Sequence, residues 1–304
     1  MSSSAVSVPA LERNVPLSLH TTIKIGGPAA YFSEPKQEKE LLQLILWAGR
    51  EGLPYFILGN GSNMIFQDEG FDGVVISLRK FDSDFIEFDN EKFKVTVSAG
   101  VSLSRLVRAC QEVSFAGIEF LANIPGTVGG ALVMNAGFSR HAGQSNEISD
   151  VVDEVRVIGK DGEVKILKRD NIQFGYRTSD LKGLIILGAT LQLWRRSSEQ
   201  IQSEIKANLE YRKLKQDIQE PNAGSVFKNP EAPAPSAGAL IEKAGFKGMR
   251  IGGIEISNKH ANYFVNKGGG TCADLIALIQ KVQKAVFNAT GITLEPEVQI
   301  IPKN

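Results

Sequence analysis

The chain has 304 residues, with 34 lysines and arginines balanced by 34 aspartates and glutamates, and 42% of its residues are hydrophobic. This balance excludes an overall field that attracts nucleic acid or an anionic membrane, and no apolar run reaches the roughly 18 residues of a membrane span. Two cysteines cannot build a disulfide framework. Residues 1–20 have no continuous apolar core, so we expect no signal peptide and a cytoplasmic globular enzyme.

The N-terminal third contains one predicted helix and three predicted strands. Ser33-Glu34-Pro35 is a helix-start signal, and the helix after it should place its apolar side chains on one face. Those side chains are Leu41, Leu42, Ile45 and Leu46. Residues 55–58 form a short apolar run that predicts a buried strand, and strands are also predicted over residues 74–78 and 93–99.

Ser102 can cap a second helix. One side of this helix is lined by Leu103, Leu106, Val107, Cys110 and Val113. Cys110 is therefore predicted to be a small buried hydrophobic residue rather than a redox centre. Strands follow over residues 151–158, 163–167 and 184–193, with a hairpin turn at Lys160-Asp161-Gly162 between the first two.

A polar helix over residues 198–215 leads into the C-terminal region, and we place a domain boundary near Ser197. The segments predicted beyond it are a Pro/Ala/Gly-rich stretch over 230–238, a helix through Ala244, a strand at 263–265, a helix capped by Thr271 and a closing strand over 297–301. The sequence as a whole predicts a mixed α+β protein in two parts.

Two glycine-rich turns are the most informative segments. Gly59-Asn60-Gly61-Ser62-Asn63 directly follows the strand at 55–58, and the second turn, IPGTVGGA, spans residues 124–131. Glycines let the backbone curl tightly and bring its N–H groups close to an anion. Neither turn matches the common phosphate motifs of doubly wound folds or P-loops. The pair therefore predicts a ligand with more than one phosphate, or with a phosphate and a ring.

Ser225 lies in the segment NAGSVFKNP, residues 222–230, where small neighbours can expose it at a tight turn. The segment lacks a G-x-S-x-G frame and no histidine partner is evident, which disfavours a hydrolase nucleophile. A serine hydroxyl can give its proton to a strongly basic acceptor such as a carbanion. The alternative is an ordinary turn or capping serine.

The order of the motifs resembles the UDP-N-acetylenolpyruvoylglucosamine reductase (MurB) family. The resemblance covers about residues 19–302. The matching segments are His20–Ala29 (HTTIKIGGPA), the two glycine turns, Asn135-Ala136-Gly137, Gly175-Tyr176-Arg177, Ala223–Pro230, Gly253–Asn262 (GIEISNKHAN) and Leu294-Glu295-Pro296-Glu297-Val298. Each motif alone is weak, and their agreement in order along the chain carries the resemblance.

The resemblance implies an α+β fold, with an FAD-binding module of the vanillyl-alcohol-oxidase (PCMH) type in two lobes and a smaller α+β substrate-binding domain. The implied ranges are 1–70 and 71–197 for the lobes and 198–304 for the substrate domain. FAD is expected to be non-covalent, since no residue stands out as a tether. The residues implied to contact it are Gly59, Asn60, Gly61, Ser62, Asn63, Pro125, Gly126, Thr127, Gly129, Gly130, Ala131, Asn135 and Gly137, with backbone N–H groups of both turns on the pyrophosphate. Ordinary turn-making is the alternative for the glycines.

The resemblance also implies the reaction. NADPH would reduce FAD and leave, and UDP-N-acetylglucosamine-enolpyruvate would then take its place and accept a hydride at its vinyl terminus, giving UDP-N-acetylmuramate. Arg177 would stabilise the developing enolate, Glu297 would polarise the substrate carboxylate, and Ser225 would deliver the proton. The resemblance thereby implies a role in peptidoglycan synthesis, and hence in cell wall biogenesis, cell shape and cell division.

Alternatives remain open for the implied site residues. Arg177 can be a surface cation beside Asp180, and Glu297 an edge-strand charge. Further candidates, for holding the sugar nucleotide, are Tyr176, Asn229, Asn258 and His260, and the alternative for His260 is a structural histidine. No ligand spacing indicates a metal site.

The spacing of the motifs indicates the shorter class of the family. Only 48 positions separate Arg177 from Ser225, too few for the extra tyrosine-bearing loop that one class inserts. Lys213 and Lys215 are candidates for diphosphate contacts or solvated helix charges. The position two residues after Glu297 is Gln299, where some members have an arginine, so no role is assigned there.

Two functions from other classes compete with the reductase. An oxidase of an alcohol or sugar on the same flavin scaffold would keep the glycine turns but need not keep Arg177, Ser225 and Glu297 together. A nucleotide-binding scaffold protein without catalysis would need none of the three. We expect small-molecule substrates, no nucleic acid or membrane partner, and a monomer.

Overall fold

The computed structural model describes residues 10–138, 140 and 146–303, and its mixed helices and strands confirm the α+β prediction. The chain forms two compact units that are interleaved in sequence. The first unit comprises Met1–Leu11, Ser33–Asn60 and Val75–Tyr211, and the second comprises Glu12–Phe32, Gly61–Val74 and Arg212–Asn304. The linear ranges 1–70, 71–197 and 198–304 remain a prediction about domains, and the compact units have other bounds.

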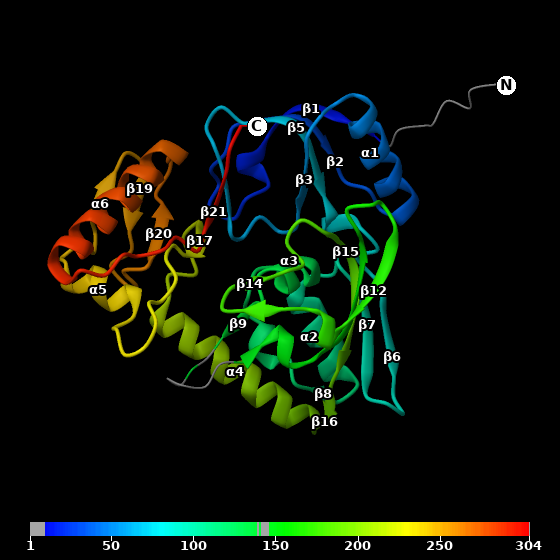
Figure 1. Cartoon of the computed structure of the whole chain (residues 1–304). Coiled ribbons are helices and arrows are strands. Elements are labelled where there is room, and N and C mark those ends of the chain that lie inside the picture. Colours follow the sequence, from blue (N-terminus) through cyan, green and yellow to red (C-terminus); the bar gives the residue numbers. More distant parts are fainter. Residues whose placement is uncertain (1–9, 139, 141–145, 304) are drawn as a thin grey trace. The chain divides into compact units, whose positions relative to one another are not determined.

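The first unit is built on a five-stranded antiparallel sheet with strand order β12-β11-β15-β7-β6 (Figure 1). Its strands are β6 (Ile86–Asp89), β7 (Lys94–Ser98), β11 (Val152–Ile158), β12 (Val164–Lys168) and β15 (Ile185–Gln192). The hairpin turn predicted at residues 160–162 is confirmed, because β11 and β12 pair antiparallel on either side of it. Val95, Val97, Val155, Ala189 and Leu191 point from the sheet into a core that also contains the buried side of the second helix, including Cys110.

Helices, 3-10 turns and short strands accompany this sheet. The helices are α1 (Glu38–Arg50), α2 (Leu103–Glu112), α3 (Val128–Val133) and α4 (Ser198–Lys215), with 3-10 turns at Leu78–Lys80, Glu119–Leu121, Ile148–Asp150 and Arg169–Asn171. The short strands are β3 (Tyr55–Leu58), β8 (Phe115–Ala116), β9 (Gly137–Phe138), β10 (Asn146–Glu147), β13 (Phe174–Gly175), β14 (Thr178–Ser179) and β16 (Trp194–Arg195). Strand β5 (Phe71–Ser77) runs across the boundary between the units.

The second unit contains a four-stranded antiparallel sheet, in the order β17-β20-β19-β18, packed with two helices. Its elements are β17 (Asn222–Ser225), α5 (Ala237–Lys243), β18 (Arg250–Ile251), β19 (Ile254–Ile256), β20 (Tyr263–Asn266) and α6 (Cys272–Thr290). N-terminal segments join this unit as β1 (Glu12–Pro16), a 3-10 turn at Leu17–Leu19, β2 (Pro28–Ser33) and β4 (Met64–Phe66), and β4 pairs in parallel with the last strand, β21 (Gln299–Ile301).

Several helices begin or end at the residues that the sequence predicts. Ser102 accepts a hydrogen bond from the backbone N–H of Arg105, and Thr271 forms a capping box with Asp274. Helix α4 has the predicted bounds. Cys110 is buried, and burial raises the pKa of its thiol, as expected for a structural residue.

Two predictions about the N-terminal third are wrong. Helix α1 begins at Glu38, with Gln37 as its cap, because Ser33 still belongs to β2. Its buried side chains are Leu41, Leu44 and Ala48, whereas Leu46 is exposed. Strand β3 has the predicted bounds, but only Leu58 is buried along it. Tyr55 is exposed and Phe56 and Ile57 are half-buried, which a short apolar run does not reveal.

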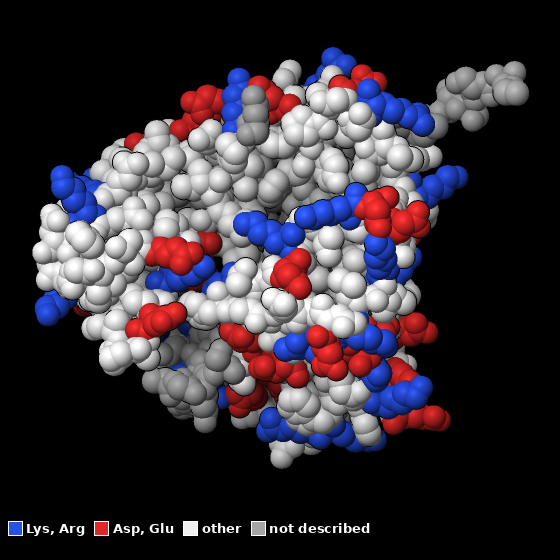
Figure 2. Space-filling model, viewed as in Figure 1, with Lys and Arg blue, Asp and Glu red and all other residues white. Residues whose placement is uncertain are grey.

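Within the described part of the chain, the helices lack the length and apolar character of a membrane span. Lys and Arg side chains are interspersed with Asp and Glu over the face shown in Figure 2. On this face, acidic and basic side chains are therefore mixed and do not gather in separate regions.

Candidate active site

The first glycine turn follows β3 and presents unused backbone donors. Gly61 has a φ of +64°, and a Cβ at this position would lie 2.2 Å from the carbonyl oxygen of His20. Glycine is therefore required by the packing of the turn itself. The N–H groups of Asn60, Gly61 and Ser62 donate no hydrogen bond to another described residue. Three successive donors of this kind can bind an anion.

The structure brings the second glycine turn beside the first. The side-chain amide of Asn60 donates to the carbonyl oxygen of Pro125 at 3.2 Å. A Cβ on Gly59 would lie 2.8 Å from Oγ1 of Thr127. Gly59 and Asn60, the part of the first turn that belongs to the first unit, therefore lie next to a segment more than sixty residues away in sequence.

The backbone donors of the second turn are used inside the protein. Gly126, Val128 and Gly129 donate to the carbonyl oxygens of Ile124, Val101 and Ala99, at 2.9, 3.0 and 3.0 Å. The expectation that both turns offer their N–H groups to an anion is therefore wrong for these three donors.

Helix α3 begins at this turn, with Thr127 as its cap. Gly130 differs from the other glycines of the turn, because it is exposed and a Cβ there would meet only Oγ1 of Thr127, at 3.6 Å. Gly130 is therefore free of the packing constraint that fixes Gly61.

Arg177 lies in the turn between β13 and β14, with a φ of +56°. Its Nη2 donates to the carbonyl oxygen of Gly137 at 3.0 Å, and its Nη1 lies 3.8 Å from Oε1 of Glu147. The guanidinium carbon is 5.0 Å from the centroid of the Tyr176 ring, within the range of a cation–π contact. These contacts hold the side chain, which is only 21% exposed. The ion-pair partner of Arg177 within its unit is Glu147 and not the sequence neighbour Asp180.

Asn135 lies behind this cluster and is buried, with 1% of its surface exposed. Its Nδ2 donates to Oε2 of Glu147 at 2.6 Å and to the carbonyl oxygen of Gly175 at 3.1 Å. Its Oδ1 accepts from the N–H of Ser149 at 3.2 Å. The side-chain amide thus ties together the segments that carry Arg177 and Glu147, while its assignment to the flavin remains a prediction.

Ser225 and Glu297 lie close together in the second unit. Ser225 is the last residue of β17 and pairs with Tyr263 of β20. The N–H of Glu297 donates to the carbonyl oxygen of Val226 at 2.8 Å, one residue beyond the serine. Asn63 joins them, because its side-chain amide donates to the carbonyl oxygen of Glu297 at 3.1 Å. Both Ser225 and Glu297 are half-buried. Arg177 belongs to the first unit, so the meeting of all three groups remains a prediction.

The other predicted substrate contacts already have structural partners or lie exposed. Oδ1 of Asn229 accepts from the N–H of Ala237 at 3.1 Å, and Asn258 is exposed. Nδ1 of His260 accepts from the N–H of Asn262 at 3.2 Å, and burial lowers the pKa of His260. The ring of His260 is therefore built into the fold through this hydrogen bond, while substrate contacts by these residues and by the half-exposed Tyr176 remain predictions.

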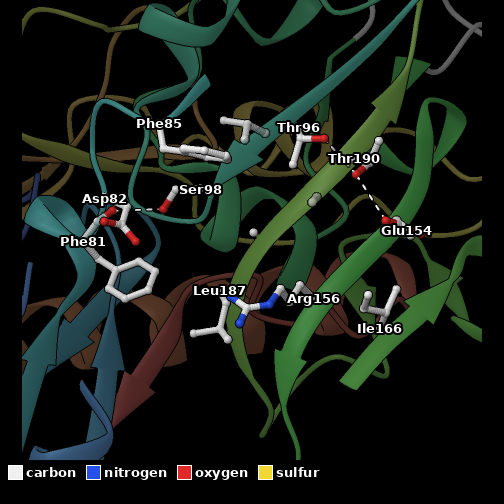
Figure 3. Close-up of a pocket in the computed structure, with 13 residues that line it drawn as sticks. Phe81, Asp82, Phe85, Thr96, Ser98, Glu154, Arg156, Ile166, Leu187 and Thr190 are labelled. Carbon is white, nitrogen blue, oxygen red and sulfur yellow. Dashed lines mark hydrogen bonds between the residues drawn. The ribbon is translucent and has the colours of Figure 1, made fainter. Parts of the chain in front are cut away.

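A separate hollow of about 230 Å³ lies on the five-stranded sheet of the first unit (Figure 3). Thr96 and Thr190 face each other across neighbouring strands, with hydroxyl oxygens 3.2 Å apart, and Arg156 and Ile166 lie further along the same surface. None of the predicted site residues lines this hollow. Among the described residues there is also no group of three or more acidic, histidine or cysteine side chains that could hold a metal.

Comparisons with known proteins identify the family. A family model for the C-terminal domain of UDP-N-acetylenolpyruvoylglucosamine reductase matches residues 216–301, and an FAD-binding-domain model matches residues 29–168. The reductase of Geobacter metallireducens is 41% identical over 290 residues, covering 95% of this chain and 93% of that protein. The reductase of Chlamydia muridarum is 41% identical over 294 residues, covering 96% and 95%. The crystal structure of the reductase (MurB) from Thermus caldophilus aligns with a TM-score of 0.81 at 33% identity, covering 96% of this chain and 99% of that one.

This chain belongs to the UDP-N-acetylenolpyruvoylglucosamine reductase family. Membership confirms the predicted fold, an FAD-binding module of the vanillyl-alcohol-oxidase type followed by a MurB C-terminal domain. It also confirms the prediction that the protein is an FAD-dependent oxidoreductase. The shorter class remains a prediction; strands β14, β15 and β16 and helix α4 occupy most of the segment between Arg177 and Ser225.

The successive unused donors at Asn60, Gly61 and Ser62 have the chemistry that a pyrophosphate requires, while their assignment to FAD, like that of Gly130, remains a prediction. Glu147, which contacts Arg177, is not among the site residues predicted from the sequence. It follows the Asn135-Ala136-Gly137 motif by ten residues and has no motif of its own, so only its contact with Arg177 reveals it.

Proposed function

We propose that this protein reduces UDP-N-acetylglucosamine-enolpyruvate to UDP-N-acetylmuramate, with NADPH as electron donor and FAD bound non-covalently. The observation that carries the proposal is the joint placement of Ser225 and Glu297 in the second unit, next to Asn63 of the first glycine turn. A family member that had lost catalysis would have no need of this arrangement. The reaction serves peptidoglycan precursor synthesis, and we propose cytoplasmic action by a monomer, with effects on cell shape and division.

FAD, when bound, supplies the hydride chemistry of the reaction. The N–H groups of Asn60, Gly61 and Ser62 hold its pyrophosphate, with the side chains of Ser62 and Asn63 as further donors. Arg177 supplies a fixed positive charge where the substrate develops an enolate. A guanidinium held by a carbonyl oxygen, a carboxylate and an aromatic ring needs little reorganisation to stabilise that charge.

Ser225 delivers the proton that completes the reduction. Its Oγ is too weak an acid to protonate most acceptors, but an enolate carbon is basic enough. Gly224, with a φ of +78° and no atom within 4 Å of a virtual Cβ, turns the chain just before the serine. Glu297, joined to the same turn through Val226, contacts the substrate carboxylate.

Two anaerobic half-reactions test the proposal. Purified protein should be yellow, should lose its flavin absorbance with NADPH, and should regain it when UDP-N-acetylglucosamine-enolpyruvate is added. Reoxidation only by simple alcohols or sugars would assign the protein to another flavin oxidoreductase class. A colourless protein that cannot be reconstituted with FAD would contradict the proposal altogether.

The serine is tested separately by Ser225→Ala. Reduction of the flavin by NADPH should keep its rate, while reoxidation by the enolpyruvyl substrate should slow by about 10²–10⁴-fold, the usual effect of a lost proton donor. Stopped-flow absorbance of each half-reaction measures the two rates. Equal slowing of both half-reactions would show that Ser225 has only a structural role.

A further inference from the structure

Glu147 lies against the guanidinium of Arg177 and takes part in no step of the proposed reaction. Its Oε1 is 3.8 Å from Nη1 of Arg177, and the two side chains are 19% and 21% exposed. Partial burial reduces the screening of this pair by water and salt. The carboxylate therefore attracts the guanidinium more strongly than a fully exposed carboxylate would. The pair lies within the first unit and does not depend on how the units are arranged.

Glu147 is itself held in place by Asn135. Its Oε2 accepts from Nδ2 of Asn135 at 2.6 Å, and the same Nδ2 reaches the carbonyl oxygen of Gly175 at 3.1 Å. Asn135 is buried and has a φ of +43°, a conformation that asparagine tolerates better than most residues. The carboxylate is thereby fixed relative to the strand that leads into Arg177.

Gly137 allows this approach. A Cβ at this position would lie 2.8 Å from Cγ of Glu147 and 2.5 Å from the carbonyl oxygen of Asn146. The carbonyl oxygen of Gly137 also accepts from Nη2 of Arg177. The Asn135-Ala136-Gly137 motif therefore supports the position of the guanidinium in two ways. The side-chain amide of Asn135 fixes Glu147, and Gly137 leaves the space that Glu147 occupies.

We infer that Glu147, fixed by Asn135, is a positioning residue for the guanidinium of Arg177. The inference rests on the proposed role of Arg177 toward the enolpyruvyl substrate. Arginine has many rotamers, and a misplacement of about 1 Å at a reacting centre can cost about 10²-fold in rate. Glu147 restricts the guanidinium to the place where the enolate charge develops, and Asn135 acts one step further from the substrate.

The direction in which the reaction rate changes when Glu147 is neutralised distinguishes a positioning role from a purely electrostatic one. The substrate is anionic, so a carboxylate near it opposes binding. If Glu147 acted only through its charge, its neutralisation would tighten substrate binding and speed the reaction. If it positions Arg177, neutralisation slows the reaction in spite of the more favourable charge.

Glu147→Gln tests the inference, because it keeps the size of the side chain and removes the charge. Reoxidation of the flavin by UDP-N-acetylglucosamine-enolpyruvate should slow by about 10–100-fold, with reduction by NADPH and FAD content within about twofold of wild type. Calorimetric titration of the oxidised protein with UDP-N-acetylmuramate should show weaker binding. In an Arg177→Ala background, Glu147→Gln should change neither quantity by more than about twofold, since the positioned group is gone.

Two further variants separate positioning from folding. Glu147 also caps the turn at Ile148–Asp150, where its side chain and that of Asp150 form a capping box. Asp150→Asn weakens this cap without touching the guanidinium, so it is the matched control and should leave both half-reactions unchanged. Asn135→Gly keeps the left-handed backbone and should reproduce the selective slowing if Glu147→Gln folds poorly.

Three outcomes overturn the inference. They are faster or unchanged reoxidation in Glu147→Gln, equal slowing of both half-reactions, and a full effect of Glu147→Gln in the Arg177→Ala background. A wild-type protein that NADPH reduces but the enolpyruvyl substrate does not reoxidise would overturn the proposed function, and the inference with it.

Discussion

Gly61 of the first glycine turn and Gly130 of the second are glycines for different physical reasons. Gly61 combines a φ of +64° with the His20 carbonyl oxygen 2.2 Å from a virtual Cβ, so its substitution disturbs the fold before any ligand is considered. Gly130 is exposed, and its virtual Cβ has a single neighbour at 3.6 Å. A substitution at Gly130 therefore tests FAD binding more cleanly than one at Gly61.

Gly130→Ala should weaken FAD binding at least about tenfold and leave the apoprotein as stable as before, or more stable. The alanine side chain would occupy the face that we assign to FAD, while alanine in a helix is favoured over glycine by about 1 kcal/mol. Fluorescence titration of apoprotein with FAD measures the first effect and thermal melting the second. The control is Gly49→Ala in α1, another helical glycine, where a Cβ meets nothing within 4 Å. Equal FAD affinity in both variants would contradict the assignment of this turn.

His260 gives a prediction about pH. Burial lowers its pKa below the ordinary 6.5, so the folded protein binds this proton less readily than the unfolded chain. Its contribution to stability is complete above about pH 6.5 and is lost as the pH falls through the folded-state pKa. Protonation of Nδ1 would also remove the acceptor for the N–H of Asn262.

His260→Gln should accordingly reduce the fall in melting temperature between about pH 7.5 and pH 5. Melting curves of the two proteins at both pH values provide the comparison. The same fall in both proteins would show that other groups, and not this histidine, cause the acid sensitivity.

At the level of elements, helix α6 shows how local sequence fixes a boundary. Thr271 accepts from the N–H of Asp274, and the Asp274 carboxylate accepts from the N–H of Thr271. A carboxylate from outside the helix, Asp68, receives the N–H groups of Cys272 and Ala273 at 2.8 and 3.0 Å. The capping box is visible in the sequence, whereas the contribution of Asp68 depends on a segment about two hundred residues away.

Thr271→Ala should lower the free energy of unfolding by about 1 kcal/mol, the usual loss when a capping hydroxyl is removed. Urea unfolding followed by circular dichroism measures the change. Thr271→Ser retains the hydroxyl and is the matched control. A loss in the serine variant as large as that in the alanine variant would mean that packing of the threonine methyl group, and not the cap, accounts for the stability.

At the level of the whole molecule, the two compact units draw on separated parts of the chain. The second unit takes Glu12–Phe32 and Gly61–Val74 along with the C-terminal region. The sequence predicts one linear boundary, near Ser197, whereas the compact units divide after Tyr211 and the second one includes N-terminal segments. The parallel pairing of β21 with β4 joins segments more than two hundred residues apart, which no local pattern reveals.

The sequence by itself determined the local features of this protein. These are the bounds of α4, the caps at Ser102 and Thr271, the hairpin turn at 160–162 and the order of motifs that indicates the family. Caps, turns and periodicity act over a few residues, so they can be recognised without knowing the fold. Only the tertiary structure decided that Glu147 faces Arg177 and that donors of the second glycine turn are used by Val101 and Ala99. Those contacts join residues about thirty positions apart, and their partners are set by how strands pair and by which backbone groups remain to be satisfied on burial.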